Sequence, residues 1–245
     1  DNVTEGLWCN DTLTVLNSIL YFNDPNAFNG GLQLAGSAAM SVDYSDVQGG
    51  FAGTANIDAD PIFSPSCKGA LAPNSACVDA GHPDVQYDDQ CFPPSVSWFG
   101  LGGPRNDMGA FGGPGACAWA DSGAWTDLGN GLVGTNGQVP VLEGYGTLRD
   151  RFPTYIQVRN GLPNAQAFLI LGVAELFAPF KLGVLVPTPD IVLPVPLDTN
   201  GELPLCFDWA REVPSGASLW WQFWIVDPGG PLGVSATNGL RGTTP

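Results

Sequence analysis

The segment MSVDYSDVQ (residues 40–48) repeats the pattern of LTVLNSILY (residues 13–21) at an offset of 27 residues. The aligned positions are Val15 and Val42, Ser18 and Ser45, and Leu20 and Val47. Upstream, GLQL from Gly31 resembles GLWC from Gly6. Two strand–turn–strand units at this spacing predict a β-solenoid, in which each unit is one coil stacked on the next.

The composition also favours strands. Of 245 residues, 44% are hydrophobic and 13% are charged, with 33 Gly and 22 Pro. Few charges and many turn formers are typical of an all-β protein with short strands, because long helices need runs of Ala, Leu, Glu, Lys and Arg. No uninterrupted apolar stretch reaches the length of about 18 residues that a membrane span needs, so we expect none.

The formal net charge is -16, with eight Lys and Arg against 24 Asp and Glu. Such a field repels nucleic acid and anionic membrane surfaces, so neither is an expected partner. It suits a soluble extracellular protein, or one that binds Ca²⁺ or neutral glycans. No signal peptide opens the sequence, and Asp1 looks like the start of a mature or cropped product.

The segment VDYSDVQGGFAGTANIDADP (residues 42–61) is acidic, rich in glycine and free of Lys and Arg. At the corners of a solenoid, Asp and Asn satisfy backbone donors, while Gly49 and Gly50 permit positive φ. Asp58 and Asp60 would share one face of a strand and supply some of the roughly six to eight oxygens that Ca²⁺ requires. We expect the structural role, with calcium at Asp58 and Asp60 as the alternative and no other cofactor.

Six cysteines without a Cys-x-x-Cys or Cys/His cluster favour disulfides and an oxidising compartment over a zinc site. Two pairs would each close a loop within a Gly/Pro-rich region. The expected disulfide pairs are Cys67–Cys77 and Cys91–Cys117. Cys9 and Cys206 remain, either paired across two domains or free.

Three motifs follow the repeated coils in a characteristic order. They are DADPIF from Asp58, SACVDAG from Ser75 and RNDMGAF from Arg105. As a set, over residues 6–113, they resemble the last coils and terminal cap of right-handed parallel β-helix proteins of secreted bacterial type. The resemblance implies a short right-handed parallel β-helix over residues 1–118. The chain departs from the family pattern at His82 and in the longer stretch of residues 84–101, which holds Cys91.

The character of the sequence changes near residue 118, at the Gly/Ala-rich GGPGACAWADSGAW. Beyond it, AFLILGVAEL is an apolar run suited to a buried strand, and Asn200-Gly201 signals a hairpin. The segment SLWWQFWIVD alternates, with one wholly apolar face and one nearly apolar face. These faces are Leu219, Trp221, Phe223 and Ile225, and Trp220, Gln222, Trp224 and Val226. The pattern is typical of a central strand in an antiparallel β-sandwich, which we expect over residues 119–245.

This second region is also similar to a β-sandwich module appended to many secreted bacterial proteins. The likeness rests on DLGNGLVGTNG, PVLEGYGTL, LVPTPD, DTNGELPL, WWQFWIVDP and the ending ATNGLRGTTP. It implies a small extracellular accessory domain. Trp220 and Trp224 would form a glycan-stacking platform if they are exposed, whereas core packing is the ordinary role of such side chains.

The sequence argues against catalysis, although many parallel β-helices are polysaccharide lyases or glycoside hydrolases. Residues 1–118 hold only Lys68 and Arg105 as cations, and the simplest role for Arg105 is an ion pair with Asp107. His82 falls in a DAGHP turn, where a solvated side chain is expected. Two or three coils are also too short for a long substrate groove. We expect no enzyme, with a fragment of a polysaccharide-degrading enzyme as the alternative.

The expected function is a secreted or surface-attached structural protein that self-associates into a filament or matrix assembly, with carbohydrate binding or adhesion as the second candidate. A solenoid needs a cap over its apolar end, and DNVTE is too small and polar to cap the first coil. A second copy docking head-to-tail would cover it and propagate as a fibre, unless further coils precede Asp1. The residues expected at this surface are Leu7, Trp8, Leu13, Val15 and Leu16.

Overall fold

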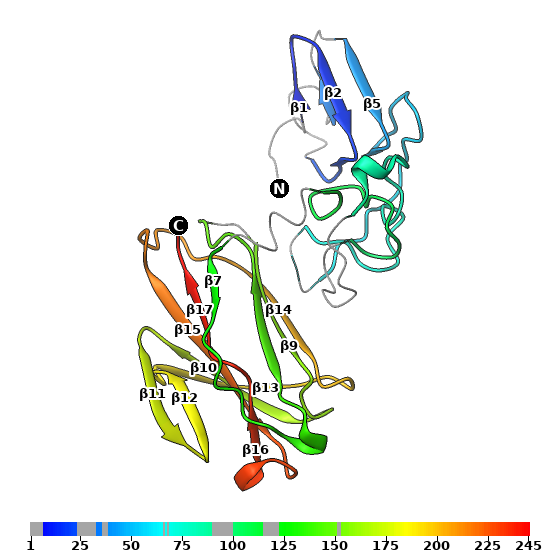
Figure 1. The fold of residues 1–245 in the computed structure, drawn as a ribbon. Coiled ribbons are helices and arrows are strands. Elements are labelled where there is room, and N and C mark those ends of the chain that lie inside the picture. The colour runs from blue at the N-terminus through cyan, green and yellow to red at the C-terminus, as the bar shows by residue number, and fades with distance from the viewer. Residues whose placement is uncertain are drawn as a thin grey trace. The chain divides into compact units, whose positions relative to one another are not determined.

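The computed structural model describes residues 7–23, 33–35, 39–65, 67, 69–89, 100–114, 123–150 and 153–245. The chain divides into two compact units, Asp1–Ala118 and Trp119–Pro245 (Figure 1). Across the described residues, regular structure consists of strands and short 3₁₀ helices, which confirms the all-β class. The 3₁₀ helices are η1 (Val85–Tyr87), η2 (Thr135–Gly137) and η3 (Pro231–Gly233). No helix in this part of the chain has the length and apolar character to cross a membrane.

The first unit pairs the two repeated segments in parallel. Its strands are β1 (Leu7–Trp8), β2 (Leu13–Leu16), β3 (Ile19–Leu20), β4 (Leu34–Ala35), β5 (Met40–Asp43) and β6 (Asp46–Val47). The pairs are β1 with β4, β2 with β5 and β3 with β6. Val15 lies opposite Val42 and Leu20 opposite Val47, which confirms the predicted register. The pairing buries one small apolar cluster, formed by Val15, Leu34, Val42 and Val47.

Side chains bonded to the backbone hold the corners of this unit. Asn56 Nδ2 donates to the carbonyls of Val42 at 2.7 Å and Phe51 at 3.1 Å, and its Oδ1 accepts the Ser45 amide at 3.0 Å. Asp43 Oδ1 accepts the amide of Thr54 at 2.6 Å. The acidic segment therefore serves turn structure, as expected.

The second unit contains two antiparallel sheets and a separate hairpin. Its strands are β7 (Trp125–Asp127), β8 (Val141–Tyr145), β9 (Pro153–Arg159), β10 (Gln166–Gly172), β11 (Glu175–Phe180), β12 (Gly183–Pro187), β13 (Ile191–Pro196), β14 (Leu203–Asp208), β15 (Ser218–Val226), β16 (Val234–Ala236) and β17 (Leu240–Thr243). One sheet has the order β13-β10-β15-β17-β7 with β16 beside β15, the other has the order β14-β9-β8, and β11 pairs with β12. Both sheets contribute to one apolar core, as in a β-sandwich.

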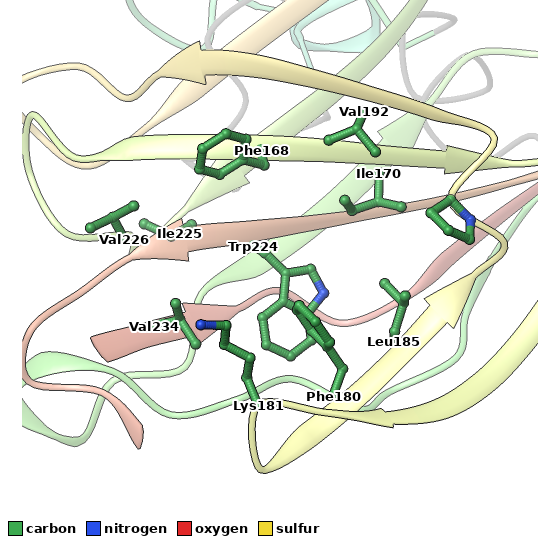
Figure 2. A pocket seen from close by; sticks show the side chains of 11 residues that line it. Phe168, Ile170, Phe180, Lys181, Leu185, Val192, Trp224, Ile225, Val226 and Val234 are labelled. Atoms are coloured by element: carbon green, nitrogen blue, oxygen red, sulfur yellow. The ribbon is translucent and has the colours of Figure 1, made fainter. Parts of the chain in front are cut away.

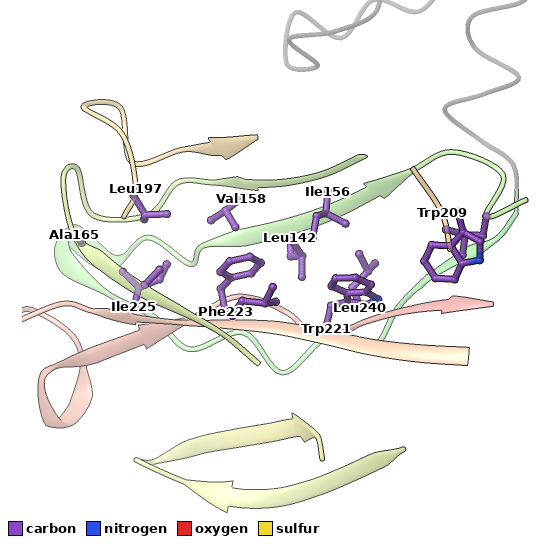
Figure 3. Close-up of a cluster of buried hydrophobic side chains, with 13 residues drawn as sticks. Leu142, Ile156, Val158, Ala165, Leu197, Trp209, Trp221, Phe223, Ile225 and Leu240 are labelled. Atoms are coloured by element: carbon purple, nitrogen blue, oxygen red, sulfur yellow. The ribbon is translucent and has the colours of Figure 1, made fainter. Parts of the chain in front are cut away.

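Figure 3 shows this core between the two sheets. Ile156 and Val158 of β9 face Trp221, Phe223 and Ile225 of β15, and each of these five side chains is at most 5% exposed. The alternation predicted for SLWWQFWIVD is confirmed, because Trp221, Phe223 and Ile225 of β15 enter the core. Burial of large apolar side chains, each contributing roughly 1.5–3 kcal/mol, is the main stabilising term in this unit.

Two sequence predictions are wrong in detail. Asn200-Gly201 does not join a hairpin, because β13 pairs with β10 while β14 pairs with β9 in the other sheet. The pair Cys67–Cys77 is not formed: Cys77 is a buried free thiol, whereas Cys67 and Cys206 are both in disulfide bonds. Cys9 is also a free thiol. Cys91 and Cys117 lie outside the described residues.

Candidate functional site

The first coil presents a strand edge that no described strand covers. The amides of Leu7 and Leu13 donate to the carbonyls of Gln33 at 3.0 Å and Ala39 at 3.1 Å in the second coil. Since successive residues of a strand direct their amides to opposite edges, and the Leu13 amide is bonded to the second coil, the Thr14 amide points away from β5. No described strand pairs with this outer edge of β1 or β2. Unpaired backbone donors and acceptors of this kind are a template for another strand.

The corner that follows β2 is covered, in contrast to that edge. Asn17 adopts a positive φ of 51°. Its carbonyl accepts the amide of Gly109 at 2.8 Å, and its Oδ1 accepts the amide of His82 at 2.7 Å. Gly109, in the RNDMGAF motif, and His82, which directly follows the SACVDAG motif, thus hold the corner after β2 against the first coil.

The expected self-association residues divide accordingly. Leu7, Leu13 and Leu16 are half-buried, so part of each remains accessible. Val15 is 7% exposed and belongs to the apolar cluster of the coil pair, which removes it from any outer surface. The side chain of Trp8 lies outside the described residues.

Two buried carboxylates of the cap accept hydrogen bonds from the backbone. Asp107 accepts the amides of Asp79 at 2.8 Å and Leu101 at 2.7 Å, and burial raises its pKa to about 7. Asp89 accepts the amides of Gly113 and Asp107, and burial raises its pKa to about 6. Protonation of these buried groups is therefore linked to the stability of the first unit.

Asp46 and Cys77 form a buried pair beside the coils. Cys77 Sγ donates to Asp46 Oδ2 at 3.2 Å, and Ala59 N donates to Asp46 Oδ1 at 3.2 Å. Burial raises the pKa of the Cys77 thiol to about 12 and also raises the pKa of Asp46. A thiol held in its protonated form is a poor nucleophile and metal ligand.

The two carboxylates considered for calcium lie apart from any larger ligand set. Asp58 Oδ1 accepts the hydroxyl of Tyr21 at 3.4 Å, and Asp60 Oδ1 accepts the amide of Ile62 at 2.9 Å. Within the described ranges, no group of three or more His, Cys, Asp and Glu side chains is arranged to hold a metal ion.

His82 and Arg105 have different partners from those expected. The His82 ring lies between those of Tyr44 and Tyr87, with centroids 4.5 and 4.7 Å away, so it is half-buried rather than solvated. Arg105 donates to the carbonyls of Gly81 and Ala80 instead of pairing with Asp107.

The two tryptophans considered for glycan stacking lie on the outer face of β15. Trp224 is 4% exposed and its ring packs edge-on against Phe180, with a centroid separation of 4.8 Å. Trp220 is half-buried. A stacking platform needs two exposed rings, and the ring of Trp224 is too buried to be one of them.

Sequence reasoning missed the surroundings of Trp224. Phe168, Phe180, Lys181 and Val192 gather around it to line a pocket (Figure 2). The available signal was an apolar outer face on both SLWWQFWIVD and AFLILGVAEL, which a sandwich strand with one solvated face would not need.

Neither the protein-family models, nor the curated proteins, nor the solved structures that were compared with this chain contain a match to it.

Proposed function

We propose that this chain is a non-catalytic, extracellular structural protein that self-associates through the outer edge of β1 and β2. The single observation that carries the proposal is the parallel pairing of two coils, with one edge of the first coil left without a described partner. A strand from a second copy would satisfy the unpaired amides and carbonyls along this edge. Repeated head-to-tail addition would give a filament, because a heterologous contact of this kind does not close.

We further propose that the first unit is the end of a right-handed parallel β-helix. Support comes from the constant offset of the three parallel strand pairs and from an additional parallel bridge between Asp46 and Ile57. In such an architecture each coil needs a neighbour to bury its apolar face. The accessible parts of Leu7, Leu13 and Leu16 would then be covered by the next coil of the assembly.

A secreted or cell-surface location is part of the same proposal. The disulfide-bonded states of Cys67 and Cys206 favour an oxidising compartment, and the net charge of -16 suits a soluble extracellular particle. The roles observed for Asp43, Asp89 and Asp107 in backbone bonding favour structure over catalysis.

The experiment is light scattering and negative-stain imaging of the chain over a wide concentration range, with Asp1 verified by mass spectrometry. We expect elongated particles whose mass grows with concentration. A stable monomer throughout would refute self-association, and a glycan array would then test the adhesion alternative.

A further inference from the structure

A pocket of about 520 Å³ opens on the outer face of the six-stranded sheet in the second unit (Figure 2). Strands β10, β13 and β15 form its floor, and the β11–β12 hairpin forms a wall. Six of the side chains that line it are Phe168, Ile170, Phe180, Lys181, Val192 and Trp224. The volume falls within the range of roughly 300–1,000 Å³ that is typical of small-molecule sites.

A buried amide ties the β11–β12 hairpin to the sheet beside the pocket. Gln222 Oε1 accepts the amide of Val186 at 3.0 Å and the indole Nε1 of Trp224 at 3.1 Å. Gln222 Nε2 donates to the carbonyls of Val184 and Thr237, each at 3.1 Å. Because a buried amide with its bonds made is costly to displace, the hairpin stays fixed to the sheet without filling the space beside it.

The lining is apolar apart from Lys181. Phe168, Phe180, Val192 and Val226 line the pocket and are 36%, 42%, 49% and 44% exposed. Water on such a surface finds few hydrogen-bond partners, so an apolar ligand that displaces it gains free energy. A contiguous patch of exposed apolar side chains of this kind is typical of an interaction site.

Lys181 supplies a single positive charge at this apolar site. It occupies the tight turn between β11 and β12, where Lys181 and Leu182 have φ of 48° and 65°, a geometry that normally selects Asn and Gly. Figure 2 shows its side chain extending from the hairpin towards Val234. Lys181 makes no ion pair or hydrogen bond with any described residue. In a chain of net charge -16, an unpaired ammonium beside an apolar pocket is complementary to an anionic group.

We propose that this pocket binds a single-chain amphiphile, with its aliphatic tail against the exposed side chains of Phe168, Phe180 and Val192 and its anionic head at Lys181. The ligand class is an alkyl chain with one carboxylate or equivalent anion. The site lies on the second unit and uses none of the residues of the β1–β2 edge, so its test is independent of self-association.

The test compares dodecanoate, dodecanol and dodecylammonium, each below its aggregation concentration. Titration is followed by calorimetry and by tryptophan fluorescence, since Trp224 lies in the floor of the pocket. We expect dodecanoate to bind with one-to-one stoichiometry, dodecanol to bind more weakly, and dodecylammonium to bind weakest because its head repels Lys181.

Two pairs of variants locate the ligand. Lys181→Gln should weaken dodecanoate about five-fold and leave dodecanol unchanged, whereas Arg211→Gln, an exposed cation outside the pocket, should change neither. Val192→Trp should weaken both ligands by filling the pocket. Ile191→Trp is its matched control, because Ile191 is similarly exposed at 46% but does not line the pocket.

Three outcomes would overturn the proposal. Equal affinity for the three alkyl compounds would remove the role of Lys181, and equal effects of Val192→Trp and Ile191→Trp would place the ligand elsewhere. Dimerisation of the ligand-free protein that Val192→Trp alone abolishes would assign the pocket to a second copy of the chain.

Discussion

The two units are stabilised by different interactions. In the second unit, thirteen buried apolar side chains from the two sheets and the segments that connect their strands form one core, which includes Phe223 and Ile225. In the first unit, the buried apolar side chains form small clusters such as that of Val15 and Val42, while Asn56, Asp43 and Asp107 bond to the backbone. The second unit is therefore stabilised mainly by apolar packing, whereas the first depends on polar side chains at its corners.

The largest loss of stability should come from a substitution in the packed core of the second unit. Phe223 is fully buried between the sheets, so Phe223→Ala should lower the free energy of unfolding of the second unit by about 3–5 kcal/mol. Urea unfolding, followed by probes in each unit, measures the loss. Phe177→Ala is the control, because Phe177 is 45% exposed and its removal should cost little. Comparable losses for the two variants would contradict the assignment of the core.

The next effect should fall on the first unit alone. Asn56→Ala removes three hydrogen bonds to the backbone around the coil corner, so we expect a loss of about 2 kcal/mol. Hydrogen exchange of the amides near Ser45 would report the opening of that corner. Asn74→Ala changes an exposed asparagine of the same unit and should be neutral. If the second unit loses as much stability as the first, the division of interactions between them is incorrect.

A smaller effect should be the pH dependence of stability. We expect the free energy of unfolding to vary with pH in the first unit and to be nearly constant in the second. Burial raises the pKa of Asp107 from its ordinary 3.8 to about 7. Between these values the folded state keeps a proton that the unfolded state releases, so the free energy of unfolding falls as pH rises through this window. We expect the first unit to melt at a higher temperature at about pH 5 than at about pH 8.

The variant Asp107→Asn separates this linkage from the other carboxylates. It removes the titrating group and should flatten the pH dependence of the melting temperature, although Asp89, with a pKa raised to about 6, retains part of it. Asp11→Asn, at an exposed position, should leave the dependence unchanged. A first unit that becomes less stable on mild acidification would contradict the burial of Asp107.

Calcium should have the smallest effect on the melting temperature of either unit. Asp58 and Asp60 are bonded to Tyr21 and Ile62, and they belong to no described ligand group of three or more side chains. Millimolar calcium should therefore leave both melting transitions where they are, in the wild type and in Asp58→Asn alike. A calcium-dependent rise that Asp58→Asn removes would restore the metal site.

The same contrast explains which structural features could be predicted from the sequence. The register of β2 on β5 follows from matching residues such as Val15 and Val42, because pairing of consecutive repeats is a local property of the pattern. The hairpins of the second unit could not be predicted from turn residues in the same way. The favourable Asn200-Gly201 turn joins strands of different sheets, while the hairpin β11–β12 turns at Lys181 and Leu182, against the usual preference. Tertiary packing, through Gln222 and Trp224, outweighs turn propensity there.

The candidate sites show the same limit. The solenoid pattern predicts an open edge at the first coil, but it does not predict that Val15 is only 7% exposed within the apolar cluster of the coil pair. The pocket around Trp224 depends on the hairpin lying over the sheet, a long-range contact without a local signature. The free thiol of Cys77 likewise follows from its burial beside Asp46, which cysteine spacing does not report.

Self-association through the outer edge of β1 and β2 is tested most directly by sedimentation velocity of Thr14→Pro beside Thr14→Val. Both remove the hydroxyl of an exposed side chain, but only proline removes the amide that points away from β5 along the outer edge of β2. If a second copy adds at this edge, Thr14→Val should assemble like the wild type, and Thr14→Pro should remain a folded monomer with an unchanged circular dichroism spectrum. Assembly of Thr14→Pro to the same extent as Thr14→Val would contradict the claim.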